Sequence, residues 1–281
     1  MTIHVASFSG GKDSTAVLLW LKEQGIEHRT IFCDTGWEHE LTYQYIRDID
    51  ARLGLELEWL RAEAYPNGFV DLVMDKQMVP TTGVRFCTQE LKIYPMHRWI
   101  EALPDGDVVL YQGIRGDESP ARALMPSRTR VDDAGGYEIV RPIFDWTVEQ
   151  VFELHRKHGI QPSPLYLSGL SRVGCMPCIM ANKRELRQIA ERFPEVRQKI
   201  EQLEDRLNEG RDGHNRRSFF RGDYIPARFQ RTYTVTTKDG RTVPVPSVKE
   251  VFDYVTKEDM KQLSLLDDPP AKCLSVYNLC E

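Results

Sequence analysis

A glycine pair between an apolar strand pattern and an amphipathic helix pattern constrains this chain more than any other feature. The segment S-F-S-G-G-K-D-S-T spans residues 7–15, after an apolar run at 4–8 and before a helical pattern at 13–24. Two glycines allow a tight turn and leave the backbone amides accessible. The helix that follows adds unpaired N–H groups and a positive dipole end. The segment therefore predicts an anion-binding loop; the structural alternative is a glycine turn that caps a helix.

The side chains of this loop suit a phosphate. Ser9, Ser14 and Thr15 supply hydroxyl donors, and Lys12 supplies a positive charge. The spacing is not that of a Walker A loop, which places four residues between its first glycine and the Gly-Lys pair. The loop therefore predicts phosphate binding of another kind.

Strand and helix patterns alternate along the first half of the chain. Strand patterns at 29–34, 55–60 and 108–112 alternate with helical patterns at 38–53, 68–76 and 90–102. This order predicts an α/β fold with a doubly wound, mostly parallel sheet. We place a domain boundary near residue 160, with a nucleotide-binding domain at 1–160 and a smaller Cys-bearing C-terminal region at 161–281.

The later part of the chain has clear helix and hairpin signals. Thr147 and Gln150 form a capping-box pattern before a helix that runs to 158. A long charged helix is predicted over 183–208 with an interruption around Pro194, and Asp239-Gly240 lies at the centre of a hairpin pattern at 235–243.

Charge and targeting signals narrow the class of protein. The chain has 37 Lys and Arg against 42 Asp and Glu, a net charge of −5 that argues against a strongly basic nucleic-acid coat. The longest apolar run near the N-terminus, 16–21, is too short to cross a bilayer, and no export leader is recognisable. We therefore expect a cytoplasmic protein that does not contact a membrane and whose six cysteines do not form a disulfide framework.

Five segments together carry a resemblance to a known family. The loop at 7–15 resembles the PP-loop of the adenine nucleotide alpha hydrolases, also called ATP pyrophosphatases. Four more segments make the chain similar to the phosphoadenylyl-sulfate (PAPS) reductase family of that superfamily: F-C-D-T-G-W-E at 32–38, R-F-C-T-Q-E-L-K at 85–92, G-I-R-G-D-E-S-P-A-R at 113–122 and P-L-Y-L-S-G-L-S-R-V-G-C-M-P-C at 164–178. The likeness extends over residues 5–180, and it implies an adenine nucleotide alpha hydrolase-like fold.

The resemblance implies a set of nucleotide-binding residues. They are Ser7, Ser9, Gly10, Gly11, Lys12, Asp13, Ser14, Asp34, Arg85, Lys92, Gly113, Arg115, Arg122 and Arg172. Arginine suits this task because its planar fork is permanently charged. Asp34 is a candidate acceptor for the ribose or the adenine, or a ligand of Mg²⁺; the alternative is a helix N-terminal acid. For Arg122 the alternative is a solvated surface residue.

The cysteines indicate a metal or a cluster. Cys175 and Cys178 form a CxxC pair that can place two thiolates on one metal. Cys87 lies where cluster-bearing family members carry a cysteine pair, whereas Cys33 looks like strand core. We predict a [4Fe–4S] cluster on Cys87, Cys175, Cys178 and either Cys273 or Cys280. A zinc site on the same ligands and a set of unconnected free cysteines are the alternatives.

The resemblance allows two enzymatic functions. In the first, ATP activates an oxygen of an acceptor such as nucleic acid, and sulfur replaces that oxygen; Lys12 and Asp13 are the catalytic candidates. In the second, adenylyl sulfate (APS) or PAPS is reduced to sulfite by a mobile thiol, here Cys280. Family reductases carry that thiol in a Glu-Cys-Gly-hydrophobe-His tail, whereas this chain ends Leu279-Cys280-Glu281.

Several partners and alternatives remain open at this stage. The expected partners are an adenine nucleotide, a sulfur or electron donor protein, a nucleic-acid acceptor and a second copy of the chain. Six basic residues interleave with aromatics over 211–228, which suits a phosphate backbone with stacking bases; a solvated loop is the alternative. Two further functions fit the sequence less well. A nucleotide-sensing scaffold without turnover would not need the intact Lys12, Asp13 and Ser14, and an enzyme of FAD synthesis would not explain the CxxC pair.

Overall fold

The described part of the chain folds into two compact units. The computed structural model describes residues 1–212, 215–237 and 239–257. Within them, the first unit comprises residues 1–68 and 87–176, and the second comprises 69–86 and 177–257. The first unit therefore continues past residue 160, where we placed the domain boundary, and the segment 69–86 belongs to the second unit.

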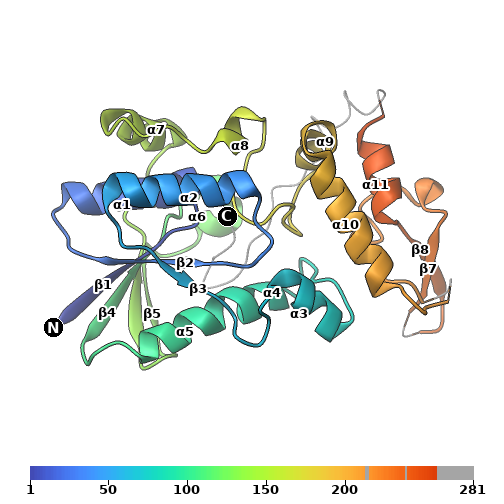
Figure 1. The fold of residues 1–281 in the computed structure, drawn as a ribbon, viewed down its shortest axis with the longest axis horizontal. Coiled ribbons are helices and arrows are strands. Elements are labelled where there is room, and N and C mark those ends of the chain that lie inside the picture. The colour runs from blue at the N-terminus through green and yellow to red at the C-terminus, as the bar shows by residue number, and fades with distance from the viewer. Residues whose placement is uncertain (213–214, 238, 258–281) are drawn as a thin grey trace. The chain divides into compact units, whose positions relative to one another are not determined.

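A six-stranded sheet forms the centre of the first unit (Figure 1). Its strands are β1 (Thr2–Ser7), β2 (Arg29–Cys33), β3 (Glu58–Leu60), β4 (Asp107–Tyr111), β5 (Arg128–Val131) and β6 (Tyr137–Val140). Their order is β3-β2-β1-β4-β6-β5, and every neighbouring pair is parallel except the antiparallel edge pair of β5 and β6. The predicted α/β fold with a mostly parallel sheet is confirmed.

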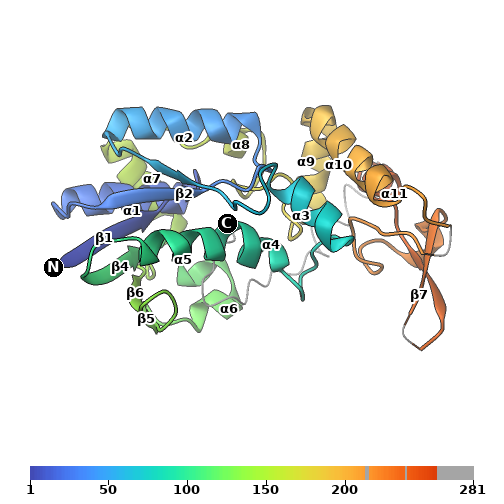
Figure 2. The ribbon, with the colours of Figure 1, turned by 60° about the horizontal axis from the view of Figure 1, so that its bottom comes forward.

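Helices cover both faces of this sheet because side chains alternate along each strand. Ala6 and Phe32 pack on one face with helices α1 (Lys12–Glu23), α2 (Glu40–Leu53) and α7 (Val148–Lys157). The neighbouring residues Val5 and Ile31 pack on the other face with α5 (Tyr94–Glu101). Figure 2 shows α1 and α2 on one side of the strands and α5 on the other.

Short elements connect the larger ones in the first unit and at its edge. They are α4 (Phe86–Thr88), η1 (Gln89–Ile93), η2 (Gly116–Glu118), α6 (Pro120–Ala123) and α8 (Pro164–Leu167). The capping box at Thr147 and Gln150 is present as predicted, with the Gln150 amide donating to the Thr147 hydroxyl.

Two local features of the first unit differ from the sequence-based prediction. The hairpin of β5 and β6 was not predicted. The helix predicted over 90–102 begins as a π-helical turn at Gln89–Ile93, where the Tyr94 amide donates to the Gln89 carbonyl. Pro95 follows at the start of α5 and has no N–H to donate, which accounts for the break in the regular helix ladder.

The second unit is mainly helical. Its elements are α3 (Phe69–Lys76), α9 (Lys183–Arg192), α10 (Pro194–Leu207), η3 (Ala227–Phe229), β7 (Tyr233–Thr236), β8 (Thr242–Val245) and α11 (Val248–Val255). Pro194 begins α10, so the predicted interruption of the long helix is confirmed. The predicted hairpin is also confirmed, with Val235 opposite Val243. None of the helices in the described residues is long and apolar enough to cross a membrane.

Candidate functional site

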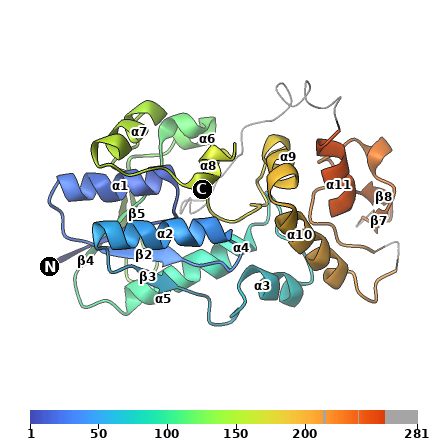
Figure 3. The ribbon, with the colours of Figure 1, turned by 45° about the horizontal axis from the view of Figure 1, so that its top comes forward.

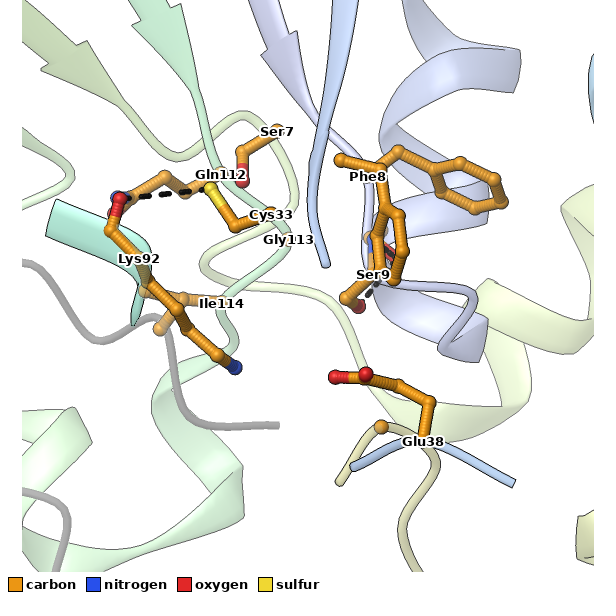
Figure 4. Close-up of a pocket in the computed structure, with 12 residues that line it drawn as sticks. Ser7, Phe8, Ser9, Cys33, Glu38, Lys92, Gln112, Gly113 and Ile114 are labelled. Atoms are coloured by element: carbon orange, nitrogen blue, oxygen red, sulfur yellow. Dashed lines mark hydrogen bonds between the residues drawn. The ribbon is translucent and has the colours of Figure 1, made fainter. Parts of the chain in front are cut away.

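A pocket lies in the first unit at the carboxyl ends of the central strands. The chain leaves β1 toward β2 and β3, and then returns to β4 on the other side of β1. Ligands bind open α/β sheets at such a reversal of strand order. The pocket has a volume of about 570 Å³, part of it open to solvent, and is lined by Ser7, Phe8, Ser9, Ser14, Phe32, Cys33, Glu38, Lys92, Gln112, Gly113, Ile114 and Gly174 (Figure 4).

The loop predicted to bind an anion borders this pocket. Gly10 lies in the left-handed region at φ +79°, which a glycine adopts without strain. The hydroxyls of Ser9 and Ser14 are 2.9 Å apart, and the Ser14 hydroxyl also donates to the Gly11 carbonyl at 3.1 Å. Ser7, Ser9 and Ser14 line the pocket. These contacts hold the loop in a tight turn at the start of α1.

Gly113 brings the end of β4 against this loop. A Cβ atom at Gly113 would lie 2.5 Å from the carbonyl carbon of Asp13 and 2.5 Å from the amide nitrogen of Ser14. Real Cβ atoms do not approach backbone atoms so closely, so only glycine fits here without a shift of the backbone. The residue after β4 thus forms one wall of the pocket.

Buried charges surround the first turn of α1. The carboxylate of Asp13, which is 1% exposed, lies 2.5 Å from the Lys12 ammonium and 2.7 Å from Nε of Arg115. Burial by itself would lower the pKa of Arg115, but the carboxylates of Asp13 and Asp117 have the larger effect, and the pKa is raised. Asp13 therefore positions two cations beside the loop.

Two opposite charges face each other across the pocket. Figure 4 shows the Lys92 ammonium and the Glu38 carboxylate pointing into the pocket from opposite sides. The Glu38 carboxylate accepts hydrogen bonds from the Trp37 amide at 3.2 Å and the Tyr43 hydroxyl at 3.1 Å. Lys92 was predicted from the sequence; Glu38 was not, although it is the last residue of the F-C-D-T-G-W-E segment.

Asp34 is buried and held by protein donors. Its Oδ1 accepts from the Gly36 amide at 2.9 Å and the Tyr43 hydroxyl at 2.7 Å, and its Oδ2 accepts from Nε of Arg61 at 2.7 Å. Burial, together with the charges of Glu38 and Asp34, raises the pKa of Tyr43, so this tyrosine stays a neutral donor. Both Asp34 oxygens already have partners, and its contact with a nucleotide or Mg²⁺ stays a prediction.

The other predicted arginines are Arg122, Arg172 and Arg85. Arg122 is buried and pairs with Glu118, and its amide donates to the Ser119 hydroxyl. Arg172 precedes the CxxC segment in the first unit, and Arg85 belongs to the second unit. Neither Arg122 nor Arg172 lines the pocket within the described residues.

One of the predicted metal-ligating cysteines lies beside the pocket. Cys175 forms an isolated antiparallel bridge with Glu38, and its Sγ is 3.3 Å from the Thr35 hydroxyl and 3.6 Å from the Glu38 carboxylate. Among the described residues, which include Cys87 and Cys178, no three His, Cys, Asp or Glu side chains form a group that could hold a metal ion. Cys273 and Cys280 lie outside the described residues.

Cys33 packs against the core on the α5 face, as expected of strand core, and also borders the pocket. It ends β2, lines the pocket, and donates its thiol hydrogen to the Lys92 carbonyl at 3.6 Å. Burial raises the pKa of this thiol to about 12, so the Cys33 side chain that lines the pocket stays protonated and uncharged.

Two residues that the sequence did not indicate hold the backbone of Lys12. Nε2 of His155, in α7, donates to the Lys12 carbonyl at 2.7 Å, and the hydroxyl of Tyr166, in α8, accepts from the Lys12 amide at 3.0 Å. These contacts join segments more than 140 residues apart in the chain. No local sequence signal exists for such a contact.

The fold and the loop together define an α/β protein of the nucleotide-binding type. The chain belongs to the phosphoadenosine phosphosulfate reductase domain family, whose model matches residues 3–181. The family that the sequence motifs indicated is therefore confirmed.

The chain is also similar to individual proteins. An uncharacterised 37.8 kDa protein of Escherichia phage 186 is 36% identical over 84% of this chain and 84% of its own length. The adenosine 5'-phosphosulfate reductase of Allochromatium vinosum is 26% identical over 64% of this chain and 69% of its own length. Among solved structures, the PAPS reductase of Candida auris in a phosphate complex has a TM-score of 0.48 at 17% identity, over 62% of this chain and 82% of that one.

Proposed function

We propose that this protein is an enzyme that binds ATP or a related adenine nucleotide at the loop of residues 9–14 and couples it to sulfur chemistry. The observation that carries the proposal is the start of α1, where backbone amides meet Lys12 and Arg115 at the edge of a pocket. Helix N-termini with nearby cations bind phosphate groups. The favoured reaction is ATP-dependent sulfur transfer to an acceptor such as nucleic acid.

In this reaction the residues of the pocket bind and orient the nucleotide. The loop amides and Lys12 would hold the phosphates, and the Lys92 ammonium would add charge from the opposite side of the pocket. An oxygen of the acceptor attacks the α-phosphorus, and pyrophosphate leaves. A sulfide-level sulfur supplied by the donor protein then attacks the acceptor atom that bears the adenylylated oxygen, and this oxygen leaves with AMP. Mg²⁺ would enter with the phosphates, because magnesium sites commonly combine one or two carboxylates with substrate oxygens.

The alternative is reduction of APS or PAPS to sulfite. It is favoured by relatives that are named as reductases of these two sulfonucleotides. In that case the nucleotide is the substrate: the Cys280 thiolate would attack its sulfur atom, and the nucleotide would leave as AMP from APS or as adenosine 3',5'-bisphosphate from PAPS. Thiols of the electron donor protein would then release sulfite from the cysteine S-sulfonate and take up the resulting disulfide. The same loop would bind the nucleotide phosphates in both reactions, so the pocket does not discriminate between them.

An iron–sulfur cluster on Cys87, Cys175, Cys178 and either Cys273 or Cys280 forms part of the proposal, with zinc as the alternative metal. A bound cluster would supply a site for sulfur or electron chemistry beside the nucleotide. The described residues contain no ready group of three ligands, so we assign no reaction step to it. Anaerobic purification followed by iron, sulfide and zinc analysis tests this part: a colourless protein with one zinc and no iron would contradict it.

Nucleic acid is the proposed acceptor because of the charge of the second unit. Residues 177–257 carry 17 Lys and Arg against 12 Asp and Glu, in a chain whose net charge is −5. The guanidinium of Arg216 lies 5.8 Å from the Tyr233 ring, and that of Arg228 lies 5.1 Å from the Phe229 ring. Basic groups beside aromatic rings suit single-stranded nucleic acid. Oligonucleotide binding that weakens as salt rises would support this acceptor, and no binding at low salt would exclude it.

The reaction itself is tested by two parallel assays on the full chain. We expect pyrophosphate release from ATP in the presence of nucleic acid, and loss of that release in Lys12→Ala. Lys157→Ala is the matched control, because Lys157 pairs with Glu23 on the surface, 2.6 Å away. Sulfite formation from APS or PAPS without pyrophosphate release from ATP would establish the reductase instead.

A further inference from the structure

The first turn of α1 is capped in an unusual way. Helix N-termini leave amides without an intrahelical partner, and a side chain at the N-cap position commonly accepts from one of them. Here the N-cap residue is Gly11, which makes no side-chain cap. The Lys12 amide donates instead to the hydroxyl of Tyr166, 154 residues later in the chain.

Tyr166 reaches this amide from α8. Figure 3 shows α8 close to the end of α1 where the helix begins. The Lys12 ammonium lies 5.7 Å from the centre of the Tyr166 ring, so the same tyrosine faces both the amide and the side chain of Lys12. His155 holds the Lys12 carbonyl on the other side. Tyr166 and His155 thus contact Lys12 from two different elements.

A phenol oxygen on this amide occupies a position that a phosphate oxygen would use. Both are oxygen acceptors, but the phosphate is charged, and a hydrogen bond from an amide to a charged oxygen is stronger than one to a neutral hydroxyl. One N–H group cannot serve both acceptors at full strength. A nucleotide phosphate that binds at Lys12 must therefore displace the tyrosine or share the amide with it.

We propose that Tyr166 is an affinity-setting residue of the phosphate site: its hydroxyl occupies the Lys12 amide in the nucleotide-free protein and yields it to a phosphate oxygen. The inference rests on the proposed nucleotide binding, and it adds a residue from outside the loop. It also predicts that only the phosphate-bearing part of a ligand competes with Tyr166. Adenosine would bind without that competition.

The test compares Tyr166→Phe with wild type, with ATP, ADP and adenosine as ligands in isothermal titration calorimetry. We expect the variant to bind ATP and ADP about fivefold more tightly, the fold-change of one neutral hydrogen bond, and to bind adenosine as wild type does. Tyr137→Phe is the matched control, because it removes a hydroxyl that bonds Nε2 of His97 at 3.0 Å. This control should leave all three affinities unchanged.

The outcomes separate this inference from the proposed function. Wild type that binds none of the phosphate-bearing nucleotides would overturn the proposed function. Wild type that binds them, with Tyr166→Phe equal to or weaker than wild type, would overturn the inference alone. If the variant folds poorly, fluorotyrosine NMR on the wild-type sequence supplies a second measurement: the Tyr166 resonance should move with ADP and stay in place with adenosine, and the reverse result would contradict the proposal.

Discussion

Nε of Arg115 lies 2.7 Å from Oδ1 of Asp13, and both side chains are almost fully buried, at 5% and 1% exposure. This ion pair joins the segment after β4 to the first turn of α1, across 102 residues of sequence. It fixes the loop of residues 9–14 against the neighbouring strand end. The same carboxylate also keeps the Lys12 ammonium beside the loop, so two cations lie at the start of α1.

Removal of Arg115 should destabilise the first unit and abolish nucleotide binding. In Arg115→Met the buried Asp13 carboxylate keeps only the Lys12 ammonium, and we expect a loss of about 3 kcal/mol, typical when one partner of a buried pair is removed. Urea unfolding followed by tryptophan fluorescence measures it, because all five tryptophans, at 20, 37, 59, 99 and 146, lie in the first unit.

The control for this variant is Arg128→Met. Arg128 is 67% exposed and pairs with Glu138 at 3.1 Å, so its removal should cost less than about 1 kcal/mol. The double variant Asp13→Asn/Arg115→Met should recover part of the stability without restoring nucleotide binding. Equal effects of Arg115→Met and Arg128→Met would contradict the structural role of the buried pair.

Gly113→Ala should disturb the pocket without a change of charge. The added methyl group would lie 2.5 Å from backbone atoms of Asp13 and Ser14, so the loop or the strand end must move. We expect at least a tenfold loss of ATP affinity, about 1.4 kcal/mol. Gly83→Ala is the matched control, since a Cβ there meets no atom within 4 Å. Unchanged ATP binding by Gly113→Ala would show that this contact tolerates a side chain.

His155 should make the first unit less stable in mild acid. Burial lowers the pKa of His155 below its ordinary value, and its Nδ1 has no hydrogen-bond partner among the described residues. The unfolded chain keeps a histidine pKa of about 6.5, so it takes up a proton at a higher pH than the folded state does. The free energy of unfolding should therefore fall as the pH drops from about 7 toward 5.5, and level off below the lowered folded pKa.

The comparison variant is His155→Gln, which retains an N–H donor for the Lys12 carbonyl but does not titrate. Tryptophan fluorescence of urea unfolding at several pH values should show a shallower acid slope in the variant than in wild type. Parallel slopes would mean that His155 contributes nothing to the pH dependence.

Glu204 should give the second unit the opposite pH dependence. Its buried carboxylate accepts from the amides of Phe219 and Val248, each at 2.9 Å, and burial raises its pKa to about 7. Because its pKa is raised in the folded state, protonation of Glu204 stabilises the second unit. This contribution to the free energy of unfolding is complete below the pKa of the unfolded chain, near 4.3, and is lost as the pH rises toward about 7. The total change is on the order of 3 kcal/mol.

Hydrogen exchange of the α10 amides measures this effect, because the second unit has no tryptophan. Protection should decrease from pH 5 to pH 7.5 in wild type, after correction for the intrinsic exchange rate. Glu204→Gln should be less protected at pH 5 and show a flatter profile, because it keeps one acceptor and loses the titration. A steep profile in the variant would assign the pH dependence to another group.

Much of the fold follows from local pattern. The alternation of strand and helix predicted the parallel sheet, and the break at Pro194 and the hairpin at Asp239-Gly240 were placed correctly. The hairpin of β5 and β6 was missed, whereas the hairpin of β7 and β8, whose strands are equally short, was marked by the Asp-Gly turn signal. The early part of the α5 region was taken as regular helix because a π-helical turn has no distinctive residue pattern.

The sequence by itself determined the glycine loop, the class of sheet and the family, because each depends on residues close together in the chain. Only the tertiary structure placed Glu38 and Cys33 in the pocket, Asp13 against Arg115, and Tyr166 on the Lys12 amide. Those relationships depend on strand order and on which side chains become buried together. Local periodicity carries no information about partners a hundred residues away, so they emerge only when the chain is packed.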